Sequence, residues 1–566
     1  MYQELREVWN ELIGEGSPFA ITEVTVRGQR IKTYAAAPPT VRDLWLASAV
    51  HGEKDYLIYQ DERISYAQAH EQVAAIANWL QDQGVGVGDR VAIAMRNYPE
   101  WLLSYWAITS IGATVVGVNA WWVGPELVYG MNDAKPKVFI ADVERLKQAL
   151  EHAGEMPPMK LVGVRIPDGC PAGVTEWSEL VRHGGTLPEV DIDPDSVACI
   201  FYTSGTTGHP KGAELTHRGC VNNAMNLGFW GTCLATLNQR LGRAPAVDPD
   251  NPPVAAGLLT TPLFHVTANN CVAYGTTMNG GKLVHMYKWD AGEALKLIER
   301  ERITSFTGVP TMSRELVNHP DFAKYDTSSL ASVGGGGAQV PPDLVGKIDQ
   351  TVATARPGTG YGMTETCGVI TSIGADFFVD KPASAGPVLP NFDARIVDAE
   401  GNDVPTGGVG ELWVKGGSVI AGYLNRPDAT AETITDGWLH TGDIARFDED
   451  GFLFIVDRAK DMVIRGGENV YCAEVESAIY EHPAVAECSV FGVADERLGE
   501  EVGAAVYLKP GERLDADALR AHCKARISPH KVPRYLWFLS EPLPRNANGK
   551  FLKRSLRDEL KTAEAA

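Results

Sequence analysis

The sequence lacks paired cysteines and an excess of basic residues. Its nine cysteines are scattered and never spaced as C-x-x-C, which excludes a zinc framework of that type and indicates free thiols in a reducing compartment. Lys and Arg number 51 against 72 Asp and Glu, a formal net charge of −21. Because nucleic-acid binding needs a basic surface, this charge argues against a nucleic-acid partner, although local basic groups can still hold a small anion.

No signal peptide is visible, because residues 1–16 carry acids and no apolar core. One uncharged run, residues 101–125, is long enough to span a bilayer. Its polar residues and the break at Gly112 favour a buried helix followed by a strand. We therefore expect a cytoplasmic protein without a transmembrane segment. The sequence leaves peripheral membrane association and oligomeric state open, a homodimer included.

At 566 residues the chain is too long for one core. Apolar runs separated by helix-length spacers predict parallel sheets covered by helices on both faces. These runs are residues 90–95, 137–141, 161–164, 282–286 and 305–310. After about Phe392, short strands with Gly- and Asp-rich turns predict a small β-barrel or a twisted antiparallel sheet. A compact α+β pattern then predicts a separate C-terminal domain.

The segment YTSGTTGHPKG, from Tyr202 to Gly212, has the composition of an anion-binding loop. Glycines let backbone N–H groups approach closely, hydroxyls donate and the lysine supplies a point charge. It is not a Walker A sequence, which requires G-x-x-x-x-G-K-[ST]. A flexible Gly/Ser turn would explain the glycines but not the whole string.

Five segments in order resemble the signatures of the adenylate-forming superfamily, which includes acyl-CoA synthetases, firefly luciferase and peptide-synthetase adenylation domains. They are YTSGTTGHPKG (202–212), YGMTE (361–365), GYLNRPDAT…DGWLHTGDIA (422–445), DRAKDMVIRGGENVYCAEVE (457–476) and LPRNANGK (543–550). The resemblance implies that a carboxylate attacks the α-phosphate of ATP, giving acyl-adenylate and pyrophosphate, and that the thiol of CoA then displaces AMP. It also implies an adenylation domain over 1–458, a hinge over 459–461 and a mobile α+β domain over 462–566.

The resemblance also implies the site residues. ATP and AMP contacts fall on Thr203, Ser204, Gly205, Thr206, Thr207, Gly208, Lys211, Gly336, Gly337, Gly360, Tyr361, Gly362, Thr364, Asp443, Arg458 and Lys550. The loop with Lys211 would hold the β- and γ-phosphates, Tyr361 would stack on adenine, Thr364 would donate to the α-phosphate, and Asp443 and Arg458 would bind ribose. Catalytic roles fall on Lys550, His265, Thr203 and Glu365, with Glu365 as the Mg²⁺ ligand. Lys460 would be the hinge, and Gly466 and Gly467 would line the path of CoA.

Several of these residues have a structural alternative. Asp443 follows a glycine, as turn residues do, and most lysines such as Lys550 are solvated. His265, in TPLFHVTANN, reads either as a group beside the acyl carboxylate or as an interior histidine at a strand end.

The acid and its acceptor are less sharply defined by the sequence. Near the expected acyl pocket, we find no Lys or Arg for a second carboxylate and no Asp for an α-amino group. The residues expected around this pocket include His265, Asn269, Asn270, Phe306 and the glycines 334–337. These features favour an apolar monocarboxylic acid, with a medium- or long-chain fatty acid as the first choice. The alternatives are an aryl-acid CoA ligase of the 4-coumarate type, an adenylate-forming enzyme with another acceptor such as a carrier protein, and a non-catalytic nucleotide or acyl-ligand sensor.

Overall fold

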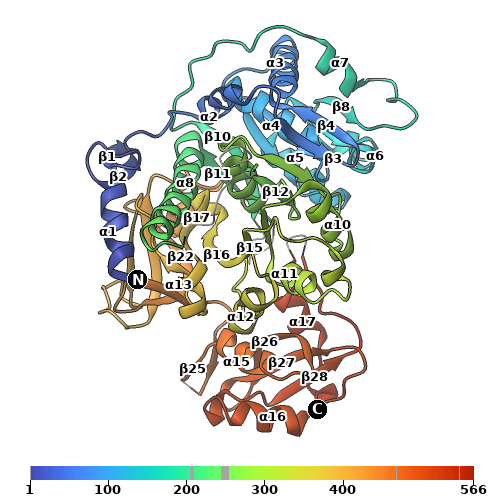
Figure 1. Ribbon diagram of the computed structural model, residues 1–566. Helices are drawn as coiled ribbons and strands as arrows, with labels where there is room; N and C mark the ends of the chain where they lie inside the picture. The colour runs from blue at the N-terminus through green and yellow to red at the C-terminus, as the bar shows by residue number, and fades with distance from the viewer. Residues whose placement is uncertain (1, 204–208, 244–253, 467, 547–548) are drawn as a thin grey trace.

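The structure is a computed structural model that describes residues 2–203, 209–243, 254–466, 468–546 and 549–566. Figure 1 shows a large N-terminal part and, below it, the C-terminal domain in red. Two α/β sheets and an antiparallel β subdomain make up most of the larger part. A two-stranded sheet, β1 (Ile21–Val26) and β2 (Gln29–Tyr34), lies beside helix α1 (Tyr2–Ile13).

The first large sheet has seven strands. Their order is β11 (Lys211–Thr216), β10 (Val197–Thr203), β6 (Thr114–Gly117), β5 (Arg90–Ala94), β7 (Val138–Asp142), β8 (Lys160–Val164) and β9 (Val174–Glu176). All neighbours pair in parallel except β10 and β11, which form an antiparallel hairpin. The chain segments that connect its strands include α5 (Gly124–Ala134), α6 (Val143–Glu151) and α7 (Trp177–Arg182).

The second large sheet has eight strands. Their order is β17 (Gly368–Gly374), β16 (Arg356–Met363), β15 (Ser332–Gly336), β14 (Ser305–Gly308), β12 (Ala256–Leu259), β13 (Lys282–His285), β3 (Asp55–Tyr59) and β4 (Glu62–Ser65). Antiparallel strands close both edges around a parallel centre. The helices along this part of the chain are α8 (His217–Arg240), α9 (Tyr274–Met278), α10 (Ala291–Glu301), α11 (Pro310–Val317), α12 (Pro342–Thr351) and α13 (Ala375–Asp380).

Helix α4 (Pro99–Ser110) accounts for the uncharged run that resembles a membrane span. Every residue of this helix is buried, and it packs against α2 (Val41–Ala47), α3 (Tyr66–Asp82) and β3. A helix enclosed on all sides needs no polar face, which explains its composition. Among the described residues no helix is long and apolar enough to cross a membrane. The expected cytoplasmic location and homodimer stay predictions.

The antiparallel unit expected after Phe392 is a six-stranded sheet. It contains β18 (Gly386–Pro387), β23 (Phe452–Arg458), β22 (Trp438–Phe447), β20 (Gly410–Gly416) and β19 (Phe392–Val397), with β21 (Ile434–Thr435) paired to β22 and α14 (Pro427–Thr433) before it. Its buried side chains form a core of their own around Leu412, Val414 and Leu439.

The C-terminal domain is built on a five-stranded sheet. Its strands are β25 (Glu468–Val470), β24 (Val463–Arg465), β27 (Gly499–Leu508) and β26 (Val485–Asp495), with β28 (Tyr535–Leu539) parallel to β27; its helices are α15 (Cys472–Tyr480), α16 (Ala516–Lys524) and α17 (Lys553–Glu559). A separate apolar core holds α15 and α16 on the sheet. The fold class predicted from the sequence is confirmed, and all nine cysteines are free thiols as expected.

Candidate active site

Tyr361, Asp443 and Arg458 come from three strands that meet at one place. They lie on β16, β22 and β23. The Tyr361 hydroxyl donates to Asp443 Oδ2 at 2.5 Å, and Arg458 Nε lies 3.0 Å from Asp443 Oδ1. The Asp443 side chain is 3% exposed and that of Arg458 is 55% exposed, so a guanidinium covers a buried carboxylate from the solvent side. Burial, assisted by this carboxylate, raises the pKa of the Tyr361 hydroxyl and keeps it a donor.

Lys550 brings a cation from the C-terminal domain to the same place. A Cβ atom added to Gly337, whose φ is +76°, would lie 3.8 Å from Lys550 Cε, so the lysine stem passes close to this glycine. Burial, together with the Arg458 cation, lowers the pKa of the Lys550 ammonium to about 8, against the opposing effect of the Asp443 and Glu365 carboxylates. Residues from four separate sequence motifs therefore share one electrostatic environment.

Glu365 is joined to Lys211 through a tyrosine that the sequence analysis did not select. The Tyr423 hydroxyl donates to Glu365 Oε1 at 2.7 Å, and Lys211 Nζ lies 4.5 Å from the centre of the Tyr423 ring. Glu365 Oε2 accepts no hydrogen bond from the described residues. No cluster of three metal-binding side chains exists in the described part of the chain. A single carboxylate with one oxygen available fits Mg²⁺, which takes most of its ligands from phosphates and water.

The phosphate loop predicted from the sequence joins the two strands of the β10–β11 hairpin. Thr203 ends β10 and Lys211 begins β11, and the two residues are cross-strand partners. Thr203 Oγ1 donates to the Lys211 carbonyl at 3.4 Å. Ser204, Gly205, Thr206, Thr207 and Gly208 lie outside the described residues. Thr364 opens a short 3-10 helix, Thr364–Thr366, directly after β16.

His265 lies between β12 and a π-helix, η3 (Thr267–Ala273). Its Nε2 atom is buried and has no hydrogen-bond partner among the described residues. Burial, with a contribution from the Lys550 cation, lowers the pKa of this imidazole to about 3, so it is neutral at physiological pH. His217, His285 and His440 have a buried Nε2 of the same kind, so the catalytic role of His265 stays a prediction that rests on its interaction with Lys550.

The predicted glycines divide into two groups. Gly360 and Gly362 are required by strand packing, because an added Cβ would lie 2.9 Å from Val369 Cγ1 and 1.9 Å from the Gly368 carbonyl. Gly336 is the cross-strand partner of Gly360, and its Cβ position meets only ordinary contacts. Gly337, beside Lys550, is favoured by its backbone conformation, because its φ of +76° is one that other residues rarely adopt, while a Cβ there would make only ordinary contacts.

Two asparagines expected near the acyl pocket serve the fold. Asn270 Nδ2 donates to the Cys367 carbonyl at 3.0 Å, and Asn269 Nδ2 donates to Asn270 Oδ1 at 2.8 Å. Trp101 Nε1 donates to Asn269 Oδ1 at 3.4 Å. Both amides are fully buried, so their hydrogen-bonding capacity is used inside the protein.

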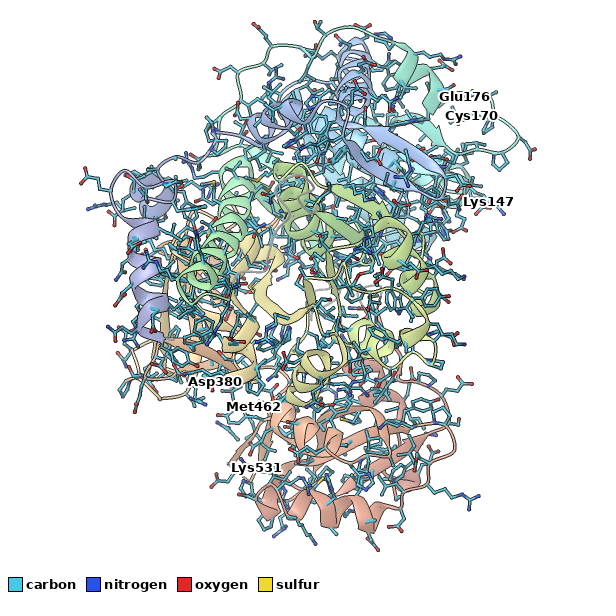
Figure 2. The ribbon with its side chains drawn as sticks, in the orientation of Figure 1. Lys147, Cys170, Glu176, Asp380, Met462 and Lys531 are labelled. Carbon is cyan, nitrogen blue, oxygen red and sulfur yellow. The ribbon has the colours of Figure 1, made fainter. Side chains whose placement is uncertain are left out.

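The predicted hinge lies where the chain passes between two sheets. β23 of the β subdomain ends at Arg458, and β24 of the C-terminal sheet begins at Val463. Lys460 is exposed in the turn between them, and Figure 2 shows Met462 close to the boundary of the C-terminal domain. Gly466 directly follows β24, before β25 begins, and has a φ of +60°. Its backbone N–H donates to the Leu498 carbonyl at 2.8 Å. Gly467 lies outside the described residues.

A second set of contacts that the sequence did not reveal holds the lysine loop against the N-terminal part. Arg545 Nη1 donates to Thr311 Oγ1 on α11 at 3.0 Å and to the Gly549 carbonyl at 2.9 Å. Arg545 Nη2 forms an ion pair with Glu487 at 2.7 Å. Arg545 therefore connects α11, the body of the C-terminal domain and the loop that carries Lys550.

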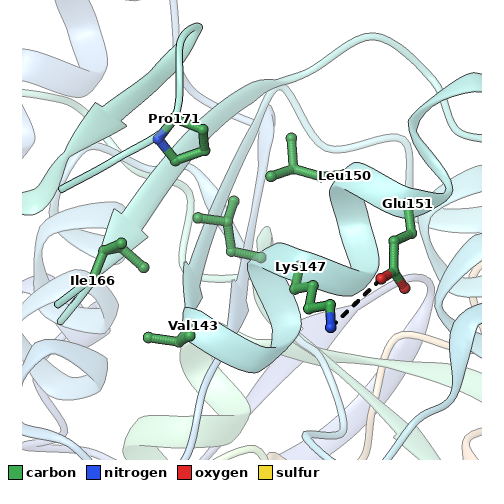
Figure 3. Close-up of a pocket in the computed structure, with 7 residues that line it drawn as sticks. Val143, Lys147, Leu150, Glu151, Ile166 and Pro171 are labelled. Atoms are coloured by element: carbon green, nitrogen blue, oxygen red, sulfur yellow. Dashed lines mark ion pairs between the residues drawn. The ribbon is translucent and has the colours of Figure 1, made fainter. Parts of the chain in front are cut away.

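A surface pocket of about 400 Å³ lies elsewhere, over helix α6. Apolar side chains such as Leu146, Leu150 and Ile166 line it. At its edge, Lys147 Nζ and Glu151 Oε1, one turn apart on α6, form an ion pair at 3.9 Å (Figure 3). Figure 2 shows Lys147 at the opposite end of the molecule from Lys531 of the C-terminal domain. The pocket contains none of the predicted site residues.

Comparison with known proteins identifies the family. The chain matches the AMP-binding enzyme family over residues 44–424 and the AMP-binding enzyme C-terminal domain over residues 474–550. It is 36% identical to a feruloyl-CoA synthase of Amycolatopsis sp over 498 residues, which cover 87% of this chain and 93% of the relative. It is 34% identical to the mitochondrial medium-chain acyl-CoA ligase ACSF2 of Mus musculus, with 89% and 84% covered.

Among solved structures, ATP-bound MatB from Rhodopseudomonas palustris superposes with a TM-score of 0.78 at 29% identity, covering 91% of this chain and 98% of that one. The fold and the site define an adenylate-forming enzyme, and the chain belongs to the AMP-binding enzyme family. Within that family it is an AMP-forming acid–CoA ligase.

Proposed function

We propose that the chain activates an apolar monocarboxylic acid, with a medium- or long-chain fatty acid as the first choice, and transfers the acyl group to CoA. The observation that carries this proposal is the position of Lys550, which reaches from the C-terminal domain into the environment of Asp443, Arg458 and Glu365. His265, which interacts electrostatically with this lysine, is neutral, and its buried Nε2 has no hydrogen-bond partner among the described residues. These groups suit one carboxylate that approaches the α-phosphate of ATP.

Each predicted residue then has a defined task. Asp443 accepts hydrogen bonds from the ribose hydroxyls, and Tyr361 packs on adenine. Lys550 stabilises the charge that develops on the carboxylate and α-phosphate oxygens, as a fixed cation does in a site closed to water. Thr364 donates to the α-phosphate, while Lys211 and the loop from Thr203 hold the β- and γ-phosphates of ATP.

Glu365 would hold a magnesium ion, which when bound neutralises phosphate oxygens and orients the pyrophosphate leaving group. Tyr423 fixes one oxygen of this carboxylate and so orients the other. We also propose that the domains 1–458 and 462–566 rotate about Lys460 after adenylation, which moves Lys550 away and brings Gly466 and Gly467 to the path of CoA.

A second substrate class has specific support. A feruloyl-CoA synthase, whose name indicates an aryl-alkenoic acid, and a medium-chain acyl-CoA ligase resemble the chain to nearly the same degree. Sequence similarity therefore does not separate an alkyl from an aryl substrate.

A panel of acids tests the proposal. We expect pyrophosphate release with ATP and Mg²⁺ to depend on the acid, and formation of acyl-CoA to require CoA as well. The panel runs from acetate through octanoate and palmitate to cinnamate and ferulate. Preference for octanoate or palmitate supports the first choice, while preference for ferulate selects the second class. The panel also includes a dicarboxylic acid and an amino acid, and turnover with these alone would contradict an apolar monocarboxylate.

The pKa of Lys550 predicts the pH dependence of adenylation. Since the pKa of Lys550 in the protein is about 8, its side chain is positively charged below pH 8. This positive charge is lost as the pH rises through that value. We expect kcat/KM for ATP, measured as pyrophosphate release without CoA, to fall above about pH 8. In Lys550→Arg, whose side chain stays charged, this falling limb should move to higher pH. An unchanged limb in Lys550→Arg would assign it to another group.

A further inference from the structure

Helix α5 presents two side chains, one turn apart, to the β10–β11 hairpin that carries Lys211. The Tyr129 hydroxyl donates to the Pro210 carbonyl at 3.1 Å. The Tyr129 ring also stacks on the His209 imidazole, with ring centres 4.4 Å apart and an angle of 14° between the planes. Because Pro210 directly precedes Lys211, the first residue of β11, Tyr129 fixes the backbone at the position where the lysine begins.

Asp133, four residues further along α5, holds the other strand of the same hairpin. Its Oδ2 accepts from the Tyr202 hydroxyl at 2.8 Å, and Tyr202 lies next to the last residue of β10. Burial, together with the Asp133 carboxylate, raises the pKa of the Tyr202 hydroxyl and keeps it a donor. Residues four apart on a helix share a face, so Tyr129 and Asp133 contact both strands of the hairpin from one side.

The second carboxylate oxygen of Asp133 bonds to a third segment of the chain. Asn425 Nδ2 donates to Asp133 Oδ1 at 2.9 Å and to the Asp133 carbonyl at 3.0 Å. Asn425 has a φ of +54°, in the left-handed region that asparagine adopts more readily than most residues. Both oxygens of the carboxylate are therefore used inside the protein, and Asp133 links the hairpin to the segment that ends at Asn425.

This segment, residues 420–425, connects β11 with Glu365. The Leu424 N–H donates to the Gly212 carbonyl of β11 at 2.8 Å. Tyr423, the preceding residue, donates from its hydroxyl to Glu365 at 2.7 Å. One face of α5 thus supports both the strand that begins with the lysine and the segment that orients the carboxylate.

We propose that Tyr129 and Asp133 are positioning residues that set Lys211 and Glu365 for the β- and γ-phosphates of ATP. A cation and a carboxylate from separate parts of the chain act together only when their spacing is fixed, and α5 is bonded to both segments. The groups proposed for the adenosine half of ATP, around Asp443, bond to one another instead. The inference rests on the phosphate roles proposed above for Lys211 and Glu365.

ATP and AMP separate this role from a general loss of stability, because AMP lacks the β- and γ-phosphates. In Tyr129→Leu and Asp133→Ala we expect ATP binding with Mg²⁺, measured by calorimetry without acid, to weaken by about fivefold or more, as for a lost hydrogen bond. AMP binding should change by less than about twofold, since the groups around Asp443 are left in place. The KM for ATP in acid-dependent pyrophosphate release should rise in parallel with the loss of ATP binding.

Two further variants of α5 serve as controls. Tyr129→Phe keeps the ring on His209 but removes the hydroxyl that bonds Pro210, so its ATP binding should lie between that of Tyr129→Leu and that of the native protein. Asn132→Ala changes a side chain of the same helix that bonds the Val128 and Glu155 carbonyls, and it should leave the binding of both nucleotides unchanged. Thermal unfolding checks that each variant is folded, and Tyr129→Phe, which loses a single hydroxyl, carries the test if a larger change unfolds the protein.

Weaker binding of ATP alone in Tyr129→Leu and Asp133→Ala would support the inference. Equal weakening of ATP and AMP, or unchanged ATP binding in either variant, would overturn it. Lys211→Ala tests the proposed function separately. If Lys211→Ala does not weaken ATP relative to AMP, the phosphate role of this lysine is wrong and the inference falls with it. If Lys211→Ala alone weakens ATP, the proposed function stands and only the role of α5 is overturned.

Discussion

Lys550→Ala is expected to reduce acid-dependent pyrophosphate release by about 10²- to 10³-fold, the usual cost of removing a charge-stabilising donor from a closed site. The cation lies in the environment of Asp443, Glu365 and Arg458, and its loop reaches this place from another domain. If the C-terminal domain rotates before the thiol attacks, the second half-reaction does not use this lysine. The rate of acyl-CoA formation from supplied acyl-adenylate should therefore change by less than about threefold.

An exposed lysine of the same domain, Lys524, provides the matched control. Lys524→Ala should leave both half-reactions unchanged, which separates loss of one particular cation from loss of charge in general. Thermal unfolding of Lys550→Ala checks that the domain stays folded. Equal loss of both half-reactions in a folded Lys550→Ala variant would contradict the proposal that each half-reaction uses a different orientation of the C-terminal domain.

Much of the fold was predictable because the strands are short apolar runs at regular intervals. The runs at 90–95 and 282–286 became the central strands β5 and β13. The uncharged run at 101–125 became helix α4 and strand β6, because burial on all sides removes the need for polar residues. These features depend on local composition and periodicity, which a single sequence displays.

Contacts between distant segments were not predictable in the same way. Asp443 and Tyr361 were both selected from motifs, but their hydrogen bond joins positions 82 residues apart. Tyr423 was missed because a tyrosine carries no signal of its own until its hydroxyl is seen to hold Glu365.

The asparagines 269 and 270 show why a polar residue near a motif has no single interpretation from sequence. Their position next to His265 suggested a place in the acyl pocket, yet their amides bond other buried groups. A polar residue near a motif can serve the ligand or the backbone behind the ligand, and the two uses have the same sequence pattern. Only the location of its hydrogen-bond partners decides between them.

Asp443→Asn is the second substitution with a large expected effect. The native carboxylate is buried, accepts from Tyr361 and pairs with Arg458, so its charge is paired before ATP arrives, and its other lone pairs are left for the ribose hydroxyls. An amide keeps the shape but donates where an acceptor is needed, and it leaves the guanidinium without its counter-charge. Truncating one partner of such a pair costs about 2–5 kcal/mol, so kcat/KM for ATP should fall on the order of 10²-fold or more.

Asp443 also acts on Lys550, because its negative charge raises the pKa of that lysine. In Asp443→Asn the falling limb of the pH profile for adenylation should therefore move below about pH 8. Tyr361→Phe is the matched control, since it removes the hydroxyl that bonds Asp443 but keeps the ring and the charge. It should cost less than about tenfold and leave the limb near pH 8. A pH profile of Asp443→Asn identical to the native one would show that the carboxylate binds nucleotide without tuning Lys550.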